Sequence, residues 1–377
     1  MIYLNHAATG FPKPEAVIHA MEEAMLRPPA GQYRSFSDGE AAEEVTPRLR
    51  GRMARILGVS SPERIFFTSG ATESLNMMIR GLDLTRDRVF VSAAEHNSVL
   101  RPLYNGGAGE IRVIPCRPDG HVEEDRLREM LRDSPKAVFI NHCSNVTGAV
   151  QDLSAISRWV HEAGGILIAD LSQSAGTIPL RLEEDGVDIG IFTGHKGLLG
   201  PQGTGGFYIR PNLHVKPLFY GGTGRDSQRL VYDETWEGYE VGTRNEPGLA
   251  GLLAGVETVL SQGVNNIYKL ENERISSLYR RIKEIPGIRL YAPNPPEGPI
   301  LSFSLEGLTP QDTAYILYHG YHIVTRVGWH CAPLLKEALS CPSSGSVRVS
   351  VGITTTEEEI EALERALKEM TGGEERP

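Results

Sequence analysis

Two stretches of the chain decide its fold: Ile166-Leu-Ile-Ala-Asp170, and Asp188-Ile-Gly-Ile-Phe192 with Thr193-Gly-His-Lys196 directly after it. Both begin as short, almost continuous apolar runs. Such runs are typical of strands in a parallel sheet that helices cover on both faces. The spacing between Asp170 and Lys196 is that of one crossover unit. It predicts that the two residues lie at the ends of neighbouring strands.

The same pattern extends on both sides of these stretches. Helical periodicity separates the runs, as in Glu123–Arg132 and Leu153–Ala163, and the second of these is followed by the helix stop Gly164-Gly165. The βαβαβ order predicts a doubly wound α/β domain with a large, mostly parallel sheet. The other predicted strands of this domain are residues 64–68, 88–92, 111–114, 137–141 and 206–210.

The pattern of predicted helices and strands changes after about Gly255. A charged amphipathic helix is predicted over residues 266–285, and a proline-rich connector follows at residues 291–299. Strands and helices then alternate, at residues 300–305, 310–319, 346–351 and 356–370. We therefore predict a large α/β domain of residues 14–258 and a smaller α+β domain of residues 1–13 and 259–377.

Composition excludes several classes of function. The 377 residues carry 48 acidic and 38 basic side chains, a net charge of −10, with no block of Lys or Arg. This balance predicts no binding to nucleic acid or to an anionic membrane. No apolar run approaches the ~20 residues of a membrane span, and no secretory signal is visible. The four cysteines are far apart, which predicts a reducing cytoplasm rather than a disulfide framework.

Candidate site residues follow the predicted strands, because ligands bind at the carboxyl ends of strands in such sheets. Ser69-Gly-Ala-Thr-Glu73 leads into a helix, and its amides and hydroxyls suit a phosphate, although a simple N-cap with a capping acid explains the same pattern. His96 is, by itself, more typical of a satisfied loop residue than of a catalyst. His142-Cys143 is not a zinc site, since adjacent side chains on an extended segment point apart.

Lys196 differs from the other seven lysines of the chain. It alone follows an apolar strand into a glycine-rich turn, where desolvation lowers the pKa of an amine. The alternative is a lysine that extends from a strand end into solvent. Asp170 ends an apolar strand, and a partly buried carboxylate there needs a partner. A lysine, a carboxylate and a phosphate-binding turn together are the groups that bind pyridoxal 5′-phosphate, through a Schiff base and a protonated pyridine nitrogen.

These motifs, in this order, resemble those of class V aminotransferase-fold enzymes. Arg326-Val-Gly-Trp-His-Cys-Ala-Pro333 is similar to the active-site cysteine segment of the cysteine desulfurase and selenocysteine lyase group within that family. The resemblance runs from Tyr3 to about Glu369 and implies the aspartate aminotransferase-like fold (fold type I) of PLP-dependent transferases. The matching motifs are Ser69–Glu73, Glu95-His-Asn97, Ser144-Asn145, Asp170–Gln173 and Thr193–Pro201.

The resemblance also implies a role for each matching residue. Lys196, His96 and Cys331 are implied as catalytic, and Asn145 and Arg348 as the residues that bind the substrate carboxylate. Thr243 is implied to reach the phosphate of the other subunit of a homodimer. From the residues alone, Cys331 is more typical of a buried, inert cysteine, and Arg348 of a surface arginine on a strand. The cofactor-binding residues implied are Ala71, Thr72, His96, Asp170, Gln173, Thr193, His195, Lys196 and Thr243.

The implied reaction converts L-cysteine to L-alanine, with sulfur passing to a Cys331 persulfide and then to an acceptor thiol or protein. Selenocysteine lyase, aminotransferase and β-lyase activities are alternatives that need no protein thiol. A non-catalytic protein that retains the fold is a third alternative. Three segments differ from the usual family pattern and are expected near the substrate entrance: Asn5-His6, Gly31–Arg34 and Gly352–Thr356.

Overall fold

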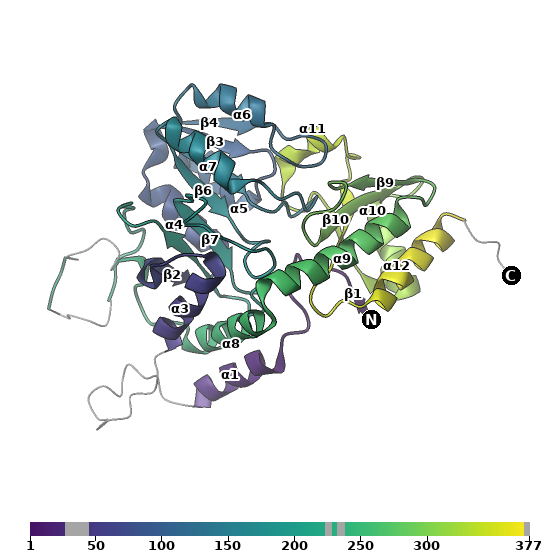
Figure 1. Cartoon of the computed structure of the whole chain (residues 1–377), viewed down its shortest axis with the longest axis horizontal. Helices are drawn as coiled ribbons and strands as arrows, with labels where there is room; N and C mark the ends of the chain where they lie inside the picture. Colours follow the sequence, from purple (N-terminus) through teal and green to yellow (C-terminus); the bar gives the residue numbers. More distant parts are fainter. Residues whose placement is uncertain (27–44, 223–227, 232–237, 373–377) are drawn as a thin grey trace.

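The computed structural model describes residues 1–26, 45–222, 228–231 and 238–372 (Figure 1). Within these residues the strands form a seven-stranded, a four-stranded and a two-stranded sheet. The segment Gly31–Arg34, which differs from the family pattern, lies outside the described residues.

The seven-stranded sheet has the strand order β2-β8-β7-β6-β5-β3-β4. Strands β3 to β7 are parallel to one another, whereas β8 runs antiparallel to both β2 and β7. All residues of β5, β7 and β8 are buried, which explains their continuous apolar sequences. The predicted large, mostly parallel sheet is confirmed. The bounds are β2 Ile65–Thr68, β3 Arg88–Ser92, β4 Glu110–Ile114, β5 Ala137–Asn141, β6 Ile166–Asp170, β7 Ile189–Thr193 and β8 Gly205–Ile209.

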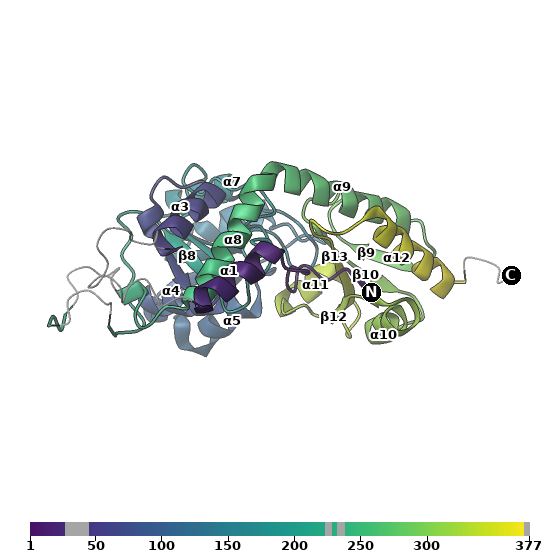
Figure 2. The same cartoon turned by 90° about the horizontal axis from the view of Figure 1, so that it is seen from below.

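Helices cover both faces of this sheet (Figure 2). On one face, α4 (Ala71–Gly81) and α5 (Asn97–Pro102) pack over an apolar cluster that includes Leu75 and Val99. A second cluster, which includes Leu49 and Leu252, fills the opposite face. The sheet therefore has a separate core on each side. The helices of the second face are α3 Val45–Leu57, α6 Glu124–Leu131, α7 Leu153–Glu162 and α8 Glu246–Gln262, with α1 Glu15–Leu26 against α8.

The four-stranded sheet is antiparallel, in the order β12-β13-β10-β9. Its core contains Phe303, Val347 and Leu363. Thr356 caps the last helix, α12, with a full capping box, as the sequence indicates. Strand β1 (Ile2–Tyr3) pairs in parallel with β11 (Ile323–Val324). The other bounds are β9 Ile288–Tyr291, β10 Ile300–Leu305, β12 Arg326–Gly328, β13 Ser346–Ser350, α9 Val264–Ile282, α10 Pro310–Tyr321, α11 Lys336–Leu339 and α12 Glu357–Met370.

The helices α8 and α9 meet at Gly263, whose φ of 81° is readily adopted only by glycine. The predicted domain boundary after residue 258 falls inside α8, which continues to Gln262. The helix predicted over residues 266–285 begins earlier, at Val264, because Gly263 provides its start. We propose Gly263 as the boundary between the two predicted domains.

Candidate active site

A cavity of about 420 Å³ opens at the carboxyl ends of β2, β5, β6 and β7, which all lie at one edge of the large sheet. This volume is within the usual range for small-molecule sites. The cavity brings together most of the predicted site residues. Those that line it are Ala71, Thr72, His96, Asn145, Asp170, Gln173, Thr193, His195 and Lys196. Cys331, Arg348 and Thr243 do not line it.

Lys196 lies on the turn that follows β7. The turn is tight because Gly194 donates a hydrogen bond to the Thr204 carbonyl, where a Cβ on residue 194 would lie only 2.2 Å from Thr204 Oγ1. Burial lowers the pKa of Lys196 to about 8, whereas the charge of Asp170 acts in the opposite direction. A large fraction of the lysine is therefore the neutral amine near pH 8. The neutral amine is the form that reacts with a carbonyl.

Asp170 ends β6 and is only 5% exposed. Its Oδ1 accepts a hydrogen bond from Ser172 N at 2.9 Å, and its backbone lies opposite Asn141 in the register of β5 and β6. Among the described residues, no basic side chain forms an ion pair with this carboxylate. A buried carboxylate at the wall of a cavity is therefore available to a protonated ligand nitrogen.

The first turn of α4 also faces the cavity. Gly70 is the N-cap residue and supplies no side-chain cap, so backbone N–H groups of the turn are available to a ligand. Glu73 instead accepts hydrogen bonds from the N–H and hydroxyl of Ser69 at 2.7 and 2.6 Å. Glu73 is thus the acid at the helix start that the sequence indicates, although the N-cap residue itself is Gly70, and the phosphate interpretation stays a prediction. Amides at a helix N-terminus suit an anionic group such as a phosphate.

His96 caps α5 and lines the same cavity. Its Nδ1 accepts a hydrogen bond from Ser98 N at 3.0 Å. Burial lowers the pKa of His96 to about 4, so the ring is neutral at physiological pH. In the neutral ring the proton must then be on Nε2, because Nδ1 is an acceptor. His96 is thus a loop residue whose Nδ1 is hydrogen-bonded, and it is also part of the cavity wall.

Glu95 is a fully buried carboxyl group that the sequence does not single out. Its Oε1 accepts hydrogen bonds from Ser92 Oγ and Asn141 N, and its Oε2 has no hydrogen-bond partner among the described residues. Burial, together with the negative charge of Asp170, raises the pKa of Glu95 to about 8. Glu95 is therefore mostly a neutral acid at pH 7. The sequence gives no signal for this, because Asp170 lies close to Glu95 only in the folded chain and is far from it in the sequence.

Replacing Glu95 with glutamine should flatten the pH dependence of stability of the cofactor-free chain. Because the pKa is raised on folding from 4.5, the contribution of Glu95 is present below pH 4.5 and is lost as the pH rises to about 8. The decrease in the free energy of unfolding over this pH range is on the order of a few kcal/mol. Urea unfolding at pH 5 and pH 8 measures it, with the exposed Glu63→Gln as control. Parallel pH profiles for wild type and Glu95→Gln would contradict the assignment.

Cys331 does not line the cavity itself but contacts Arg326, which does. Its Sγ is 3.3 Å from Nη2 of Arg326, which lines the cavity, and its carbonyl accepts a hydrogen bond from Asn97 N. His330 and Cys331 both have positive φ values, of 50° and 63°, which is a strained backbone for non-glycine residues. The thiol is half-buried rather than enclosed, so the structure does not support an inert core cysteine. Arg326 also belongs to the site, although the resemblance implies no role for it.

Arg348 is fully buried, and the alternative of a surface arginine is wrong. Its Nη1 donates to the carbonyl of Asn145 at 2.9 Å and its Nη2 to Oδ1 of Asn5 at 3.2 Å. Burial and the nearby charge of Arg326 lower the pKa of Arg348 to about 9. Its Nε and the Oδ1 of Asn145 are buried without a partner among the described residues. Two close guanidinium groups without a carboxylate partner favour an anionic ligand.

Thr243 lies apart from these residues, in an exposed loop before α8. The segments that differ from the family pattern lie on two sides of Lys196. Asn5 contacts Arg348, whereas His6 and Gly352 line a second cavity of about 40 Å³ behind Lys196. In this second cavity Glu271 is buried, and burial raises the pKa of its carboxyl to about 8. The position of these segments near the substrate entrance stays a prediction.

The sequence profile of the family described as Aminotransferase class-V matches residues 2–363. The chain belongs to the class-V aminotransferase family. A "Probable cysteine desulfurase" of Methanothermobacter thermautotrophicus is 32% identical, over 98% of this chain and 95% of that protein. A "Cysteine desulfurase" of Escherichia coli O157:H7 is 29% identical, over 98% and 93%. The solved apo structure of a cysteine desulfurase from Thermococcus onnurineus NA1 superposes with a TM-score of 0.87 at 27% identity, over 99% and 95% of the chains.

Class-V aminotransferases depend on pyridoxal 5′-phosphate, and the described residues fit this cofactor. Lys196 provides a buried amine with a lowered pKa, and Asp170 a buried carboxylate without an ion-pair partner. The first turn of α4 provides amides for the phosphate. The fold and family inferred from the sequence motifs are thus confirmed.

Proposed function

We propose that this chain is a PLP-dependent cysteine desulfurase, which converts L-cysteine to L-alanine and passes the sulfur to Cys331. The observation that carries the proposal is the position of the Cys331 thiol, 3.3 Å from the Arg326 guanidinium at the wall of the Lys196 cavity. The thiol is half-buried rather than enclosed, so it can take sulfur from a substrate that is bound in this cavity. Aminotransferase and β-lyase reactions need no such thiol.

The cofactor would be held by residues that already surround the cavity. Lys196 would bind its aldehyde carbon, Asp170 its ring nitrogen, and Gln173 its ring oxygen. His96 would lie against the ring. Its phosphate would contact Ala71, Thr72, Thr193 and His195.

When bound, pyridoxal phosphate joins the substrate amine and withdraws electrons from Cα, which makes the Cα–H bond acidic. The Lys196 amine would be the base that removes this proton, because its lowered pKa leaves a large fraction of it unprotonated near pH 8. Arg348 and Asn145 bind the substrate carboxylate. Arg348 supplies a buried guanidinium whose Nε has no hydrogen-bond partner among the described residues. Asn145 supplies its Nδ2 group, which also donates to the carbonyl of His330 at 2.5 Å.

Cys331 performs the transfer of sulfur. Its thiolate attacks the sulfur of the substrate, an S–S bond forms, and the carbon–sulfur bond of the substrate breaks. The electron pair of that bond stays with the carbon skeleton, which takes up protons and leaves as alanine. The persulfide on Cys331 is then reduced or passed on by an acceptor thiol or protein.

The proposed assembly is a homodimer in which Thr243 reaches the partner's phosphate site. Its exposure on a loop outside its own cavity supports this role. The proposed location is the cytoplasm, supported by four free cysteines. None of the helices in the described ranges is long and apolar enough to cross a membrane.

Product analysis tests the proposed function. The protein, loaded with pyridoxal phosphate, is incubated with L-cysteine and a reducing thiol, and alanine, sulfide and pyruvate are counted. We expect alanine and sulfide in equal amounts. Pyruvate in place of alanine would establish a β-lyase instead, and a preference for L-selenocysteine over L-cysteine would establish a selenocysteine lyase.

A further inference from the structure

The loop of residues 143–151, which joins β5 to α7, carries Asn145 and is almost entirely buried. It is a tight hairpin: Cys143 forms a β-bridge with Val150, and Ser144 Oγ accepts hydrogen bonds from the N–H groups of Val146 and Thr147. Because the turn is closed by these bonds, a displacement at one end of the loop is passed on to the other.

The inner end of the loop is fixed by the small sheet. Arg348 Nη1 donates to the carbonyl of Asn145 at 2.9 Å, and Ser302 Oγ donates to the carbonyl of Val146 at 2.6 Å. Ser302 and Arg348 lie opposite each other in the register of β10 and β13. The position of Asn145 therefore depends on how this loop sits against the strands that carry Arg348.

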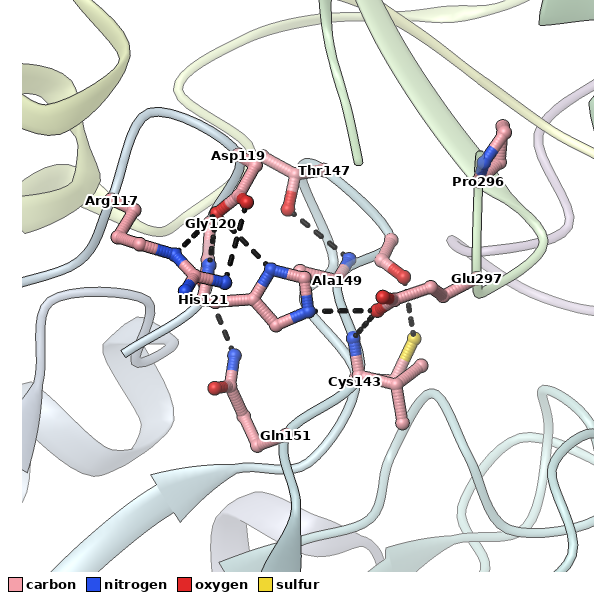
Figure 3. Close-up of polar contacts among 12 residues, drawn as sticks. Arg117, Asp119, Gly120, His121, Cys143, Thr147, Ala149, Gln151, Pro296 and Glu297 are labelled. Carbon is pink, nitrogen blue, oxygen red and sulfur yellow. Dashed lines mark hydrogen bonds and ion pairs between the residues drawn. The ribbon is translucent and has the colours of Figure 1, made fainter. Parts of the chain in front are cut away.

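The outer end of the loop is held by a charged pair (Figure 3). Glu297, on the proline-rich connector before β10, accepts a hydrogen bond from Val150 N at 2.8 Å with Oε2. The same oxygen is 2.9 Å from Nε2 of His121, which lies on the turn after β4. Gly298 N also donates to the carbonyl of Gly148 at 2.9 Å. Three segments far apart in the sequence thus meet at Glu297.

The surroundings of His121 favour its protonated form. Nδ1 is 3.1 Å from Asp119 Oδ1 but forms no hydrogen bond among the described residues, so both ring nitrogens lie close to a carboxylate oxygen and only Nε2 is hydrogen-bonded. The hydrogen bond with Glu297 and the charges of both acids raise the pKa of His121, although partial burial acts against them. The stabilisation is therefore present below pH 6.5 and is lost as the pH rises through the raised value. The other titratable groups here are Arg117 on the turn, Cys143 on the loop and Tyr268 on α9.

We propose that His121 and Glu297 are positioning residues that hold the loop, and with it Asn145, in the place that binds the substrate, and that this hold weakens when His121 loses its proton. When the ring is neutral, its hydrogen bond to Glu297 loses the positive charge of the donor and is therefore weaker than the charge-assisted bond. Glu297 then holds Val150 less tightly. Only the role of Asn145 in this inference rests on the proposed function.

Hydrogen exchange in the full-length chain loaded with pyridoxal phosphate tests whether His121 and Glu297 hold the loop, and it needs no measurement of enzyme activity. Protection factors of peptides covering residues 143–151 are measured at pH 6 and pH 9, each against the intrinsic rate at that pH. In wild type we expect protection to fall about fivefold between the two values. In His121→Gln and Glu297→Gln it should be low at both, and the double variant should be no lower than either. Protection of the loop that is independent of pH, or unchanged in both variants, would overturn the proposal.

The matched control is His161→Gln. His161 Nε2 is 2.8 Å from Asp188 Oδ2, so the pair has the same chemistry, but it joins α7 to β7 away from the loop. This variant should leave the loop unchanged. In steady-state assays, His121→Gln should raise KM for L-cysteine about fivefold and change kcat less than about twofold. Loop protection that varies with pH in a protein that does not desulfurate cysteine would overturn the proposed function but not the role of His121 and Glu297 in holding the loop.

Discussion

The Lys196→Ala variant should lose turnover of L-cysteine by at least about a thousand-fold, because it removes both the amine that binds the aldehyde and the base at Cα. Borohydride reduction gives a direct measurement. It should attach the cofactor irreversibly to wild type and not to this variant. The fold should survive, since Lys196 makes no side-chain hydrogen bond in the described structure.

Lys13→Ala is the matched control for this prediction. Burial lowers the pKa of Lys13 to about 8 as well, but its Nζ donates to the carbonyl of His195 at 2.7 Å and does not line the larger cavity. Lys13→Ala should therefore still be labelled on Lys196 by borohydride. Irreversible labelling of Lys196→Ala, or the absence of labelling in Lys13→Ala, would show that the cofactor binds a lysine other than Lys196.

The Cys331→Ala variant should bind the cofactor like wild type but desulfurate L-cysteine about a hundred-fold or more slowly. In this account the Cys331 thiol, half-buried and 3.3 Å from Nη2 of Arg326, is the group that receives the sulfur. The measurement is the rate of alanine formation, together with the cofactor spectrum before and after addition of cysteine.

Cys341→Ala is the control for the second prediction. Cys341 is also half-buried and lies ten positions away, but its Sγ donates to the carbonyl of Gly345, and burial raises the pKa of its thiol. Its loss should leave the rate unchanged. Full activity of Cys331→Ala with L-cysteine would mean that the sulfur leaves by another route.

The large sheet and its site could be predicted from local sequence. Apolar strands such as Ile166–Asp170 identify a parallel sheet, and parallel strands bring their carboxyl ends to one edge, so Asp170 and Lys196 meet there for a topological reason. Helix α8 was not predicted. Three glycines within it, Gly248, Gly251 and Gly255, have low helix propensity, and packing of the helix against neighbouring elements compensates for this.

The contacts that tune the site could not be predicted, because they join distant parts of the chain. His121 and Glu297 are 176 positions apart, and Asn145 is 203 positions from Arg348. The raised pKa of Glu95 likewise depends on burial and on Asp170, which no local pattern encodes. Sequence motifs therefore identify the reacting groups, whereas their protonation states follow only from the fold.

The most direct test of the account is to locate the transferred sulfur. Full-length protein loaded with pyridoxal phosphate is mixed with one equivalent of L-cysteine without reductant, alkylated, digested and examined by mass spectrometry. The account predicts one added sulfur atom on the peptide that contains Cys331, formed together with alanine and absent from Cys331→Ala. Added sulfur on the Cys341 peptide, or alanine without any added sulfur, would contradict it.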